Sequence, residues 1–121
     1  MARLETAVQT ASKTYTRNHA AQSERVETLR ARIAEATAGG RPDMVARHRK
    51  RGKLLVRERI DLLVDPGTAF LELSSLAAYG QYGGEVPGSG IVTGIGIVHG
   101  LPCIVIANDA TVKGGSFYHE T

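Results

Sequence analysis

The fold is decided by residues 91–107, which read IVTGIGIVHGLPCIVIA. Two apolar runs, 91–98 and 103–107, flank a His-Gly pair, and short runs rich in β-branched residues are typical of strands. A tight turn between two such runs predicts a β-hairpin. Gly94 and Gly96 in the first run leave room for another backbone to approach. The second run is apolar at every position, so we expect it to be buried on both faces in the middle of a sheet.

Upstream of the hairpin, the apolar residues change to the three- and four-residue spacing of helices. We expect a first helix to begin at Ser23, which can cap it, and to end at the Gly39-Gly40 pair. A second, short helix runs from Pro42 to about Arg51, and a third covers Val56–Val64, with Val56, Ile60, Leu63 and Val64 on one face. A turn at 65–68 and a strand over 70–74 then lead toward the hairpin.

These elements divide the chain into three parts and indicate the α/β class. Residues 1–22 are polar and have no sustained apolar period, so they are predicted to form a flexible N-terminal arm. Residues 23–64 form a helical basic region. Residues 65–121 begin an α/β domain, but they offer too few strands for a complete sheet. The missing strands are expected to follow residue 121.

Positive charge is concentrated in one block of the chain. Residues 41–59 carry eight basic side chains against two acidic ones: Arg41, Arg47, Arg49, Lys50, Arg51, Lys53, Arg57 and Arg59. Lys113 is the single Lys or Arg after this block. Such a block can bind a CoA phosphate, a partner subunit or another anion, or can simply be a solvated helix face. No nucleic-acid partner is expected, because no aromatic residue lies among the cations.

Composition excludes several other classes of protein. The single cysteine, Cys103, rules out an internal disulfide and offers no metal-ligand cluster, so no metal site is expected. No apolar run has the length of a membrane span, and the N-terminus lacks the apolar core of a secretory signal. We therefore expect a cytoplasmic protein without a membrane partner.

The candidate for binding chemistry is residues 107–116, which read ANDATVKGGS. An apolar strand leads into a polar turn whose glycines can expose backbone N–H groups to an oxyanion, a thioester carbonyl or a phosphate. Lys113 would add a point charge. The segment is neither a Walker loop nor a dinucleotide fingerprint. The alternative is a tight connection whose glycines serve backbone geometry alone, with Asp109 stabilising the turn. The chain contains no complete catalytic set.

Three stretches together resemble the carboxyltransferase (β) subunits of biotin-dependent acyl-CoA carboxylases. They are RGKLLVRERID at 51–61 with the turn at 65–67, GIVTGIG at 90–96, and the segment from Asn108-Asp109 to Gly114-Gly115. Residues 85–88 and 107–115 are most similar to methylcrotonoyl-CoA carboxylase, with the propionyl-CoA and geranyl-CoA carboxylases as alternatives. The resemblance runs from about residue 46 to residue 121. It implies the N-terminal piece of a crotonase-like superhelical fold.

The same resemblance implies an activity and its cofactors. CO₂ would pass from carboxybiotin, carried by a partner (α) subunit, to the enolate of an acyl-CoA substrate such as 3-methylcrotonyl-CoA. ATP would be used only by the partner biotin carboxylase. The β subunits would form a homo-oligomer in the cytoplasm, or in the mitochondrial matrix of a eukaryote.

The resemblance also bears on site residues. Asn108, Lys113, Gly114, Gly115 and Ser116 match a motif near the CoA cleft, so they are expected to line its wall, with Lys113 near a CoA phosphate. The glycine-rich turns that hold the reacting carbonyls would lie downstream, so no catalytic residue is expected here and the fragment alone would be inactive. Two other readings stay open: a small basic binding module for an anionic partner, and a helical arm that builds oligomer contacts.

Overall fold

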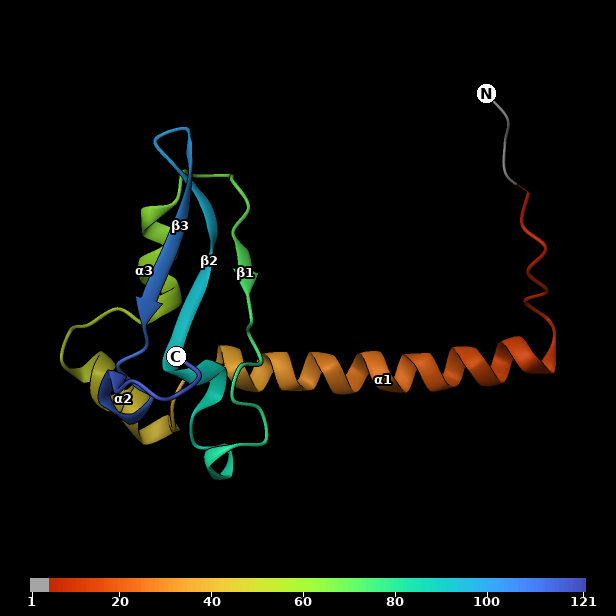
Figure 1. The fold of residues 1–121 in the computed structure, drawn as a ribbon, viewed down its shortest axis with the longest axis horizontal. Coiled ribbons are helices and arrows are strands. Elements are labelled where there is room, and N and C mark those ends of the chain that lie inside the picture. Colours follow the sequence, from red (N-terminus) through yellow and green to blue (C-terminus); the bar gives the residue numbers. More distant parts are fainter. Residues whose placement is uncertain (1–4) are drawn as a thin grey trace. The chain divides into compact units, whose positions relative to one another are not determined.

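The computed structural model describes residues 5–121. The chain forms two compact units that meet in sequence between Ala31 and Arg32. Its helices and strands are α1 (Lys13–Thr37), α2 (Pro42–Lys50), α3 (Val56–Leu63), β1 (Leu71–Leu73), β2 (Ile91–Val98) and β3 (Leu101–Asn108) (Figure 1). Short 3₁₀ turns lie at Tyr82–Gly84, Pro87–Gly90 and Lys113–Gly115. This mixture of helices with a small antiparallel sheet confirms the predicted α/β class.

Helix α1 begins earlier than predicted. Its first residue is Lys13 instead of Ser23, and the Oγ of Ser12 accepts a hydrogen bond from the N–H of Tyr15 at 3.1 Å. Residues 13–22 have no apolar stripe, but Ala, Gln and Arg are good helix formers, and Ser12 supplies the cap. The predicted start of this helix at Ser23 is therefore wrong, whereas the flexibility of an arm over residues 1–22 stays a prediction. The predicted arm also includes residues 1–4, which lie outside the described residues, and the division into three domains stays a prediction.

Helices α2 and α3 lie where the sequence predicts them. At the start of α3, the carboxylate of Glu58 accepts the N–H of Leu55 at 2.7 Å. The other oxygen of Glu58 accepts a hydrogen bond from Arg49 of α2, also at 2.7 Å. Val56 and Ile60 are buried, whereas Leu63 is 49% exposed, so the apolar face of α3 is narrower than predicted.

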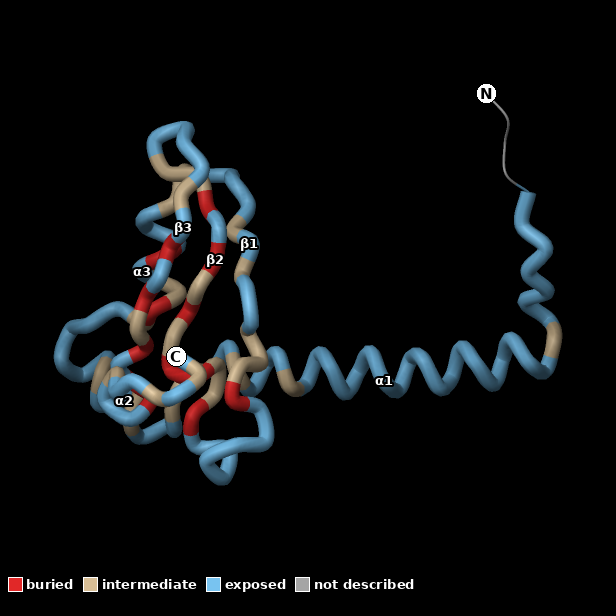
Figure 2. The backbone as a smooth tube through the Cα atoms, viewed as in Figure 1, coloured by how far each residue is buried: buried red, intermediate tan, exposed pale blue. Residues whose placement is uncertain are grey.

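The three strands form one antiparallel sheet in the order β1-β2-β3. Leu71 pairs with Ile95, and Ile95 pairs with Ile104 on the other side. Helix α3 packs against β2 and β3. The core lies in this contact, where Figure 2 shows buried residues along α3, β2 and β3. Its members are Val56, Ile60, Val92, Val105 and Ala107, with Val64 and Phe70 packed beside them.

The hairpin and its glycines explain the closeness of this packing. His99 and Gly100 both have positive φ, 50° and 77°, which is the type I′ turn that suits a two-residue hairpin. A Cβ on Gly94 would lie 2.3 Å from the ring of Phe70, and one on Gly96 would lie 2.7 Å from Val64. The glycines of β2 therefore admit core side chains as well as the approaching carbonyl of Leu71, which would be 2.6 Å from a Cβ at Gly94.

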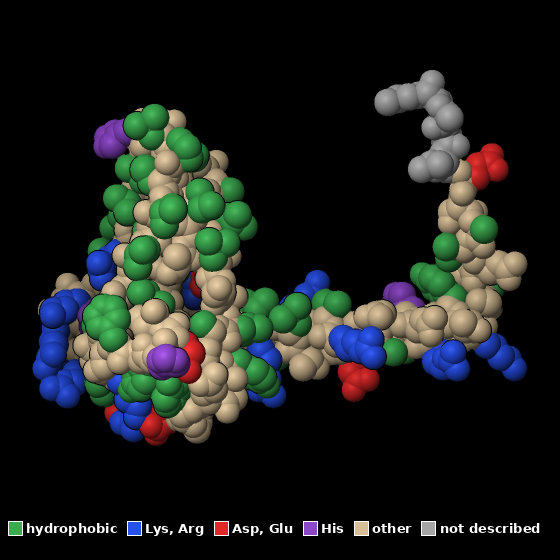
Figure 3. Space-filling view, in the orientation of Figure 1, with side chains coloured by type: hydrophobic (Ala, Val, Ile, Leu, Met, Phe, Trp, Pro, Cys, Tyr) green, Lys and Arg blue, Asp and Glu red, His purple; other side chains and the backbone are tan. Residues whose placement is uncertain are grey.

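Strand β3 corrects one prediction, because it lies at the edge of the sheet and not in the middle. Ile104 and Ile106 are 74% and 65% exposed. They share their face with exposed Leu71, Leu73 and Ile95, and hydrophobic side chains gather over the strands in Figure 3. Helix α3 covers only the opposite face, and the described residues place no fourth strand beside β3. Pro102 fits this position, because proline is confined to edge strands and strand ends.

Candidate functional site

The candidate site is the bend at residues 108–116, which follows β3. The N–H of Asp109 donates to the carbonyl of Gly90 at 2.9 Å, so the bend is tied to the start of β2. The N–H of Val112 then donates back to the carbonyl of Asp109 at 3.1 Å. Val112 is 1% exposed and fixes the middle of the bend in the protein interior.

A buried polar cluster holds the bend against the exit of α1. One oxygen of Asp109 accepts hydrogen bonds from the N–H and the hydroxyl of Thr111, at 2.8 and 2.6 Å. The same hydroxyl accepts the N–H of Gly40 at 2.9 Å. Asp109 thus has the turn-stabilising role expected from its position. With Asp109 8% and Thr111 2% exposed, these hydrogen bonds are shielded from water.

Glycines make this contact possible. A Cβ on Gly39 would lie 2.8 Å from Oδ2 of Asp109, and one on Gly40 would lie 1.9 Å from the carbonyl oxygen of Thr111. Sequence reasoning predicted that this pair ends α1, but it missed the distant contact. A signal was present in the second glycine, because one glycine is sufficient to end a helix.

The structure brings the five predicted site residues together in the bend, but most of their polar groups are engaged within it. Asn108 donates from Nδ2 to the carbonyl of Gly115 at 3.4 Å, and the Ser116 hydroxyl donates to the carbonyl of Lys113 at 2.8 Å. Lys113, Gly114 and Gly115 have consecutive positive φ values of 45°, 74° and 83°. The bend is therefore a left-handed turn whose outer residues, Lys113, Gly114 and Ser116, are exposed.

The ammonium of Lys113 forms an ion pair with Glu85, 28 residues earlier. The hydrogen bond from Lys113 and its charge hold the pKa of the Glu85 carboxyl below its usual value, with a smaller effect of Arg41. Both side chains of the pair are about half exposed, 42% for Lys113 and 51% for Glu85. Sequence reasoning identified Lys113 and missed Glu85, because nothing local links positions so far apart.

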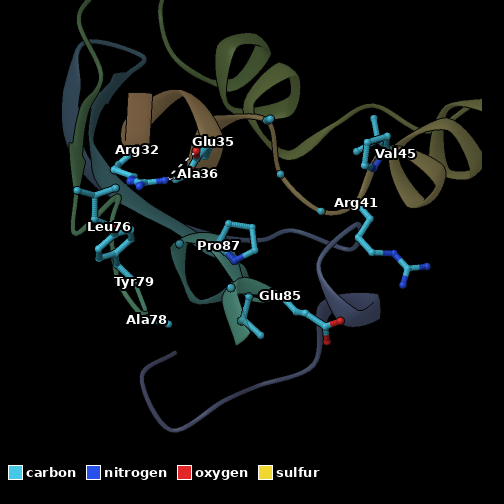
Figure 4. Close-up of a pocket in the computed structure, with 18 of the residues that line it drawn as sticks. Arg32, Glu35, Ala36, Arg41, Val45, Leu76, Ala78, Tyr79, Glu85 and Pro87 are labelled. Atoms are coloured by element: carbon cyan, nitrogen blue, oxygen red, sulfur yellow. Dashed lines mark hydrogen bonds and ion pairs between the residues drawn. The ribbon is translucent and has the colours of Figure 1, made fainter. Parts of the chain in front are cut away.

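A pocket of about 930 Å³ lies beside the bend (Figure 4). Its wall is built by the last turn of α1, by α2 and by the loop at residues 76–88. Small residues such as Ala36, Ala78 and Pro87 line most of it, while Arg32, Arg41 and Glu85 add charge. This volume is within the range of small-molecule sites, about 300–1,000 Å³. Gly39, Gly40 and Glu85 belong to the pocket and also contact the bend, so the two features share a wall.

Two side chains of the pocket wall interact with each other. The guanidinium of Arg32 lies 5.6 Å from the ring centre of Tyr79 and donates to Glu35 at 3.0 Å. The hydrogen bond that Arg32 donates to Glu35 raises the pKa of Arg32, so its charge is retained. Sequence reasoning missed this group, since Arg32 belongs to a helix and Tyr79 to a glycine-rich loop.

The predicted basic block forms an exposed patch around α2 (Figure 3). Three of its cations are paired with carboxylates: Arg41 with Asp43, Arg49 with Glu58 and Arg57 with Glu72. Among the described residues, none of the others lies within ion-pair distance of a carboxylate; these are Arg47, Lys50, Arg51, Lys53 and Arg59. The five are exposed and can attract an anionic ligand or surface.

Residues 5–121 show neither a metal-binding cluster nor a membrane-spanning helix. In that range, no three His, Cys, Asp or Glu side chains come close enough together to hold a metal ion. None of the helices described there is long and apolar enough to cross a lipid bilayer.

The chain belongs to the carboxyl transferase domain family, whose model matches residues 47–121. Its structural neighbours are carboxyltransferase subunits, which confirms the expected crotonase-like fold class. The β subunit of *P. aeruginosa* geranyl-CoA carboxylase superposes with a TM-score of 0.77 and 36% identity, over 97% of this chain and 22% of that subunit. Transcarboxylase 12S, a hexamer solved with hydrolysed methylmalonyl-CoA, gives 0.67 and 34%, over 78% of this chain and 20% of that one.

Within the family, methylcrotonoyl-CoA carboxylase subunits are prominent among the curated relatives. The chain is 56% identical over 96 residues to the biotin-dependent 3-methylcrotonyl-coenzyme A carboxylase beta1 subunit of *Mycobacterium tuberculosis*, covering 79% of this chain and 18% of the relative. It is 48% identical over 110 residues to the mitochondrial methylcrotonoyl-CoA carboxylase beta chain of *Arabidopsis thaliana*, covering 91% and 19%. The chain thus spans about a fifth of the length of these relatives.

Proposed function

We propose that this chain is part of the carboxyltransferase subunit of a biotin-dependent acyl-CoA carboxylase that acts on 3-methylcrotonyl-CoA or a similar branched substrate. The observation that carries the proposal is the 56% identity with the 3-methylcrotonyl-coenzyme A carboxylase subunit. Identity to a propionyl-CoA carboxylase subunit is lower, 39% over 98 residues. Propionyl-CoA and geranyl-CoA are therefore the alternative substrates.

The proposed role of this segment is to hold the CoA part of the substrate. The bend presents Lys113 and Gly114 at the surface, beside a pocket whose wall includes Glu85, Gly39 and Gly40, which contact the bend. The cations around α2 add a field that attracts the phosphates of CoA. Asn108 and Ser116 support the bend from within through their hydrogen bonds to its backbone.

The chemistry itself is assigned to other parts of the enzyme. When bound on its carrier, carboxybiotin supplies the CO₂ that the acyl-CoA enolate takes up. The developing oxyanions need preorganised N–H donors, and in this proposal those donors belong to other segments of the subunit. The partners are a biotin carboxylase and carrier subunit, which alone uses ATP, and further copies of the carboxyltransferase subunit. A mitochondrial matrix location is proposed for a eukaryotic source, since two eukaryotic relatives are named as mitochondrial, and a cytoplasmic location is proposed otherwise.

The activity is tested with the whole carboxyltransferase subunit and its biotin-carrying partner. Fixation of labelled bicarbonate is measured with 3-methylcrotonyl-CoA, propionyl-CoA and geranyl-CoA, with avidin as the control for biotin dependence. We expect the highest kcat/KM for 3-methylcrotonyl-CoA and none with the 121-residue chain alone. Absence of acyl-CoA-dependent fixation in the whole enzyme would refute the proposal, and turnover by the short chain would refute the assignment of chemistry to other segments.

The exposed cations favour one second candidate, a binding module for a polyanionic partner. This candidate predicts salt-sensitive binding of heparin that CoA does not displace. The carboxyltransferase proposal predicts instead that CoA competes with any polyanion bound near α2. A competition titration of the 121-residue chain at two salt concentrations separates the two.

A further inference from the structure

The positive charge of the bend is already matched by a carboxylate of the same chain. Lys113 is the single Lys or Arg after Arg59 in the sequence, and its ammonium is ion-paired with Glu85. Glu85 also faces Arg41, whose guanidinium donates to both oxygens of Asp43, at 3.1 and 2.8 Å. The carboxylate of Glu85 therefore occupies the place where an incoming anion would meet the charge of the bend.

The backbone on both sides of this ion pair leaves room for the partners to separate. Glu85 directly follows Gly83 and Gly84, which have φ values of 63° and 78°. A Cβ at either glycine, or at Gly114 beside Lys113, would meet nothing within 4 Å. Both side chains of the pair are about half exposed, so breaking it uncovers no buried charge.

The backbone of Lys113 adopts a disfavoured conformation, as the backbone also does at Ser74, Ala78, Tyr82, Ser89 and His99. Its φ is 45°, in the left-handed region that a residue with a side chain rarely adopts, and it stands beside two glycines that adopt this region freely. A lysine at such a position is disfavoured by local geometry, and such outliers concentrate where function requires them. The fold therefore holds Lys113 in this conformation at some cost in local backbone energy.

We infer that Glu85 is a displaceable internal counter-ion of the CoA site: it holds Lys113 in place when the site is empty and must yield to a ligand phosphate. This inference rests on the proposed function, since it names a residue that tunes binding at the same bend. A phosphate can carry two negative charges, whereas the carboxylate carries one. The ammonium of Lys113 is therefore attracted more strongly to the phosphate and leaves Glu85 to bind it. Ligands with a single carboxylate gain no such advantage, and Glu85 therefore selects for phosphorylated ligands.

The test is isothermal titration of the whole carboxyltransferase subunit that contains this chain with CoA and, separately, with inorganic pyrophosphate at low salt. Glu85→Gln removes the competing charge and should tighten both ligands about two- to fivefold, the range that an exposed ion pair accounts for. Lys113→Gln in the Glu85→Gln background should abolish this gain. The matched control is Glu120→Gln, which changes the net charge by the same amount. The carboxylate of Glu120 accepts a hydrogen bond from the hydroxyl of Tyr82 and is not paired with Lys113. This variant should leave both affinities unchanged.

Unchanged or weaker binding in Glu85→Gln, with an unchanged thermal melt, would overturn the inference. If Glu85→Gln fails to fold, Glu85→Asp gives the same test, because a shortened carboxylate loosens the ion pair and should tighten binding in the same direction. If no variant binds CoA while Glu85→Gln still tightens pyrophosphate, the proposed function fails and the counter-ion role stands. If all variants bind CoA equally, the proposed function stands and the counter-ion role fails.

Discussion

The carboxylate of Asp65 accepts a hydrogen bond from the backbone N–H of Gly100 at 2.7 Å, and its other oxygen accepts that of His99 at 2.8 Å. Asp65 lies just beyond α3, and its own N–H donates to the carbonyl of Ile97 at 2.8 Å. Both turn residues of the β2–β3 hairpin are therefore fastened to the end of the helix that covers the sheet. Sequence reasoning assigned Asp65 to a local turn only.

The first prediction concerns acid stability. The N–H groups of Gly100 and then His99 lower the pKa of Asp65. A carboxyl whose pKa is lower in the folded state stabilises the fold above its unfolded pKa, about 3.9. That stabilisation is lost as the pH falls through the lower, folded value. Urea unfolding of the wild type and Asp65→Asn should therefore differ at pH 6, and the difference should shrink toward pH 2.

The comparison with Asp65→Asn is needed because other carboxyls behave in the same direction. The pKa values of Glu58 and Glu85 are also lowered, by the N–H of Leu55 and by Lys113 respectively. Those groups are present in both proteins and cancel in the difference. A gap between the two unfolding curves that is constant with pH would contradict the role given to Asp65.

The second prediction concerns the polar cluster under the bend. Thr111→Val removes the hydroxyl that donates to Asp109 and accepts the N–H of Gly40. Asp109, which is buried, and Gly40, which is partly buried, then each lose a hydrogen bond, which should lower the free energy of unfolding by about 1–3 kcal/mol. The measurement is urea denaturation followed by circular dichroism. Thr93→Val is the control, since no hydrogen bond of its hydroxyl occurs among the described residues, and a change above about 0.5 kcal/mol there would point to a general effect of valine.

The third prediction is a stabilising substitution. Ser89 is fully buried, has a φ of 57°, and its hydroxyl has no hydrogen-bond partner among the described residues. Ser89→Gly removes both the strained backbone and the unpaired hydroxyl, and should raise the free energy of unfolding by about 1 kcal/mol. Ser74→Gly is the matched control, because Ser74 has a φ of 54° but is exposed. If the free energy of unfolding rises equally in both variants, the unpaired hydroxyl of Ser89 does not destabilise the fold.

The fourth prediction concerns the exposed face of the sheet. Ile104→Lys adds a charge where the side chain is 74% exposed, so the change in unfolding free energy should stay within about 0.5 kcal/mol. Fluorescence of a bound hydrophobic dye such as ANS should fall clearly, because an apolar surface of this kind attracts it. Val105→Lys, on the adjacent and 8% exposed residue, should unfold the chain. Equal dye binding by the wild type and Ile104→Lys would show that this face is not accessible.

Sequence patterns predicted the limits of the helices and strands better than they predicted which elements pack beside one another. The limits of α2, α3 and β2 follow from proline, glycine and periodicity, which act within a few residues. The position of β3 at the edge of the sheet could not be predicted, because an all-apolar strand has the same sequence pattern whether its second face is covered or exposed. The start of α1 was missed because helix propensity and the Ser12 cap outweigh the lack of an apolar stripe.

In the candidate site, too, contacts between residues close in sequence could be predicted and contacts between distant residues could not. Turn chemistry identified the bend and Lys113, and the turn-stabilising role of Asp109 follows from its position beside Thr111. Glu85, Gly40 and the pocket wall could not be found in this way, since their contacts join positions that are 28 and 71 residues apart. One of the hypotheses left open by the sequence, a helical arm that builds oligomer contacts, predicts that deleting residues 1–40 changes assembly but leaves CoA affinity intact. The contact between Gly40 and Thr111 limits any such deletion to residues before Gly39.

The absence of any side chain at Gly40 also has a mechanical consequence. Because the carbonyl of Thr111 lies so close to Gly40, the segment that links α1 to α2 is in direct contact with the bend after β3. If another protein pulled or twisted that link, the displacement would reach the bend directly, without passing through the hydrophobic core. A protein that docks on α2 would in this way alter ligand affinity at the bend. Spin labels on Arg47 and Ser116 would then report that α2 and the bend move together.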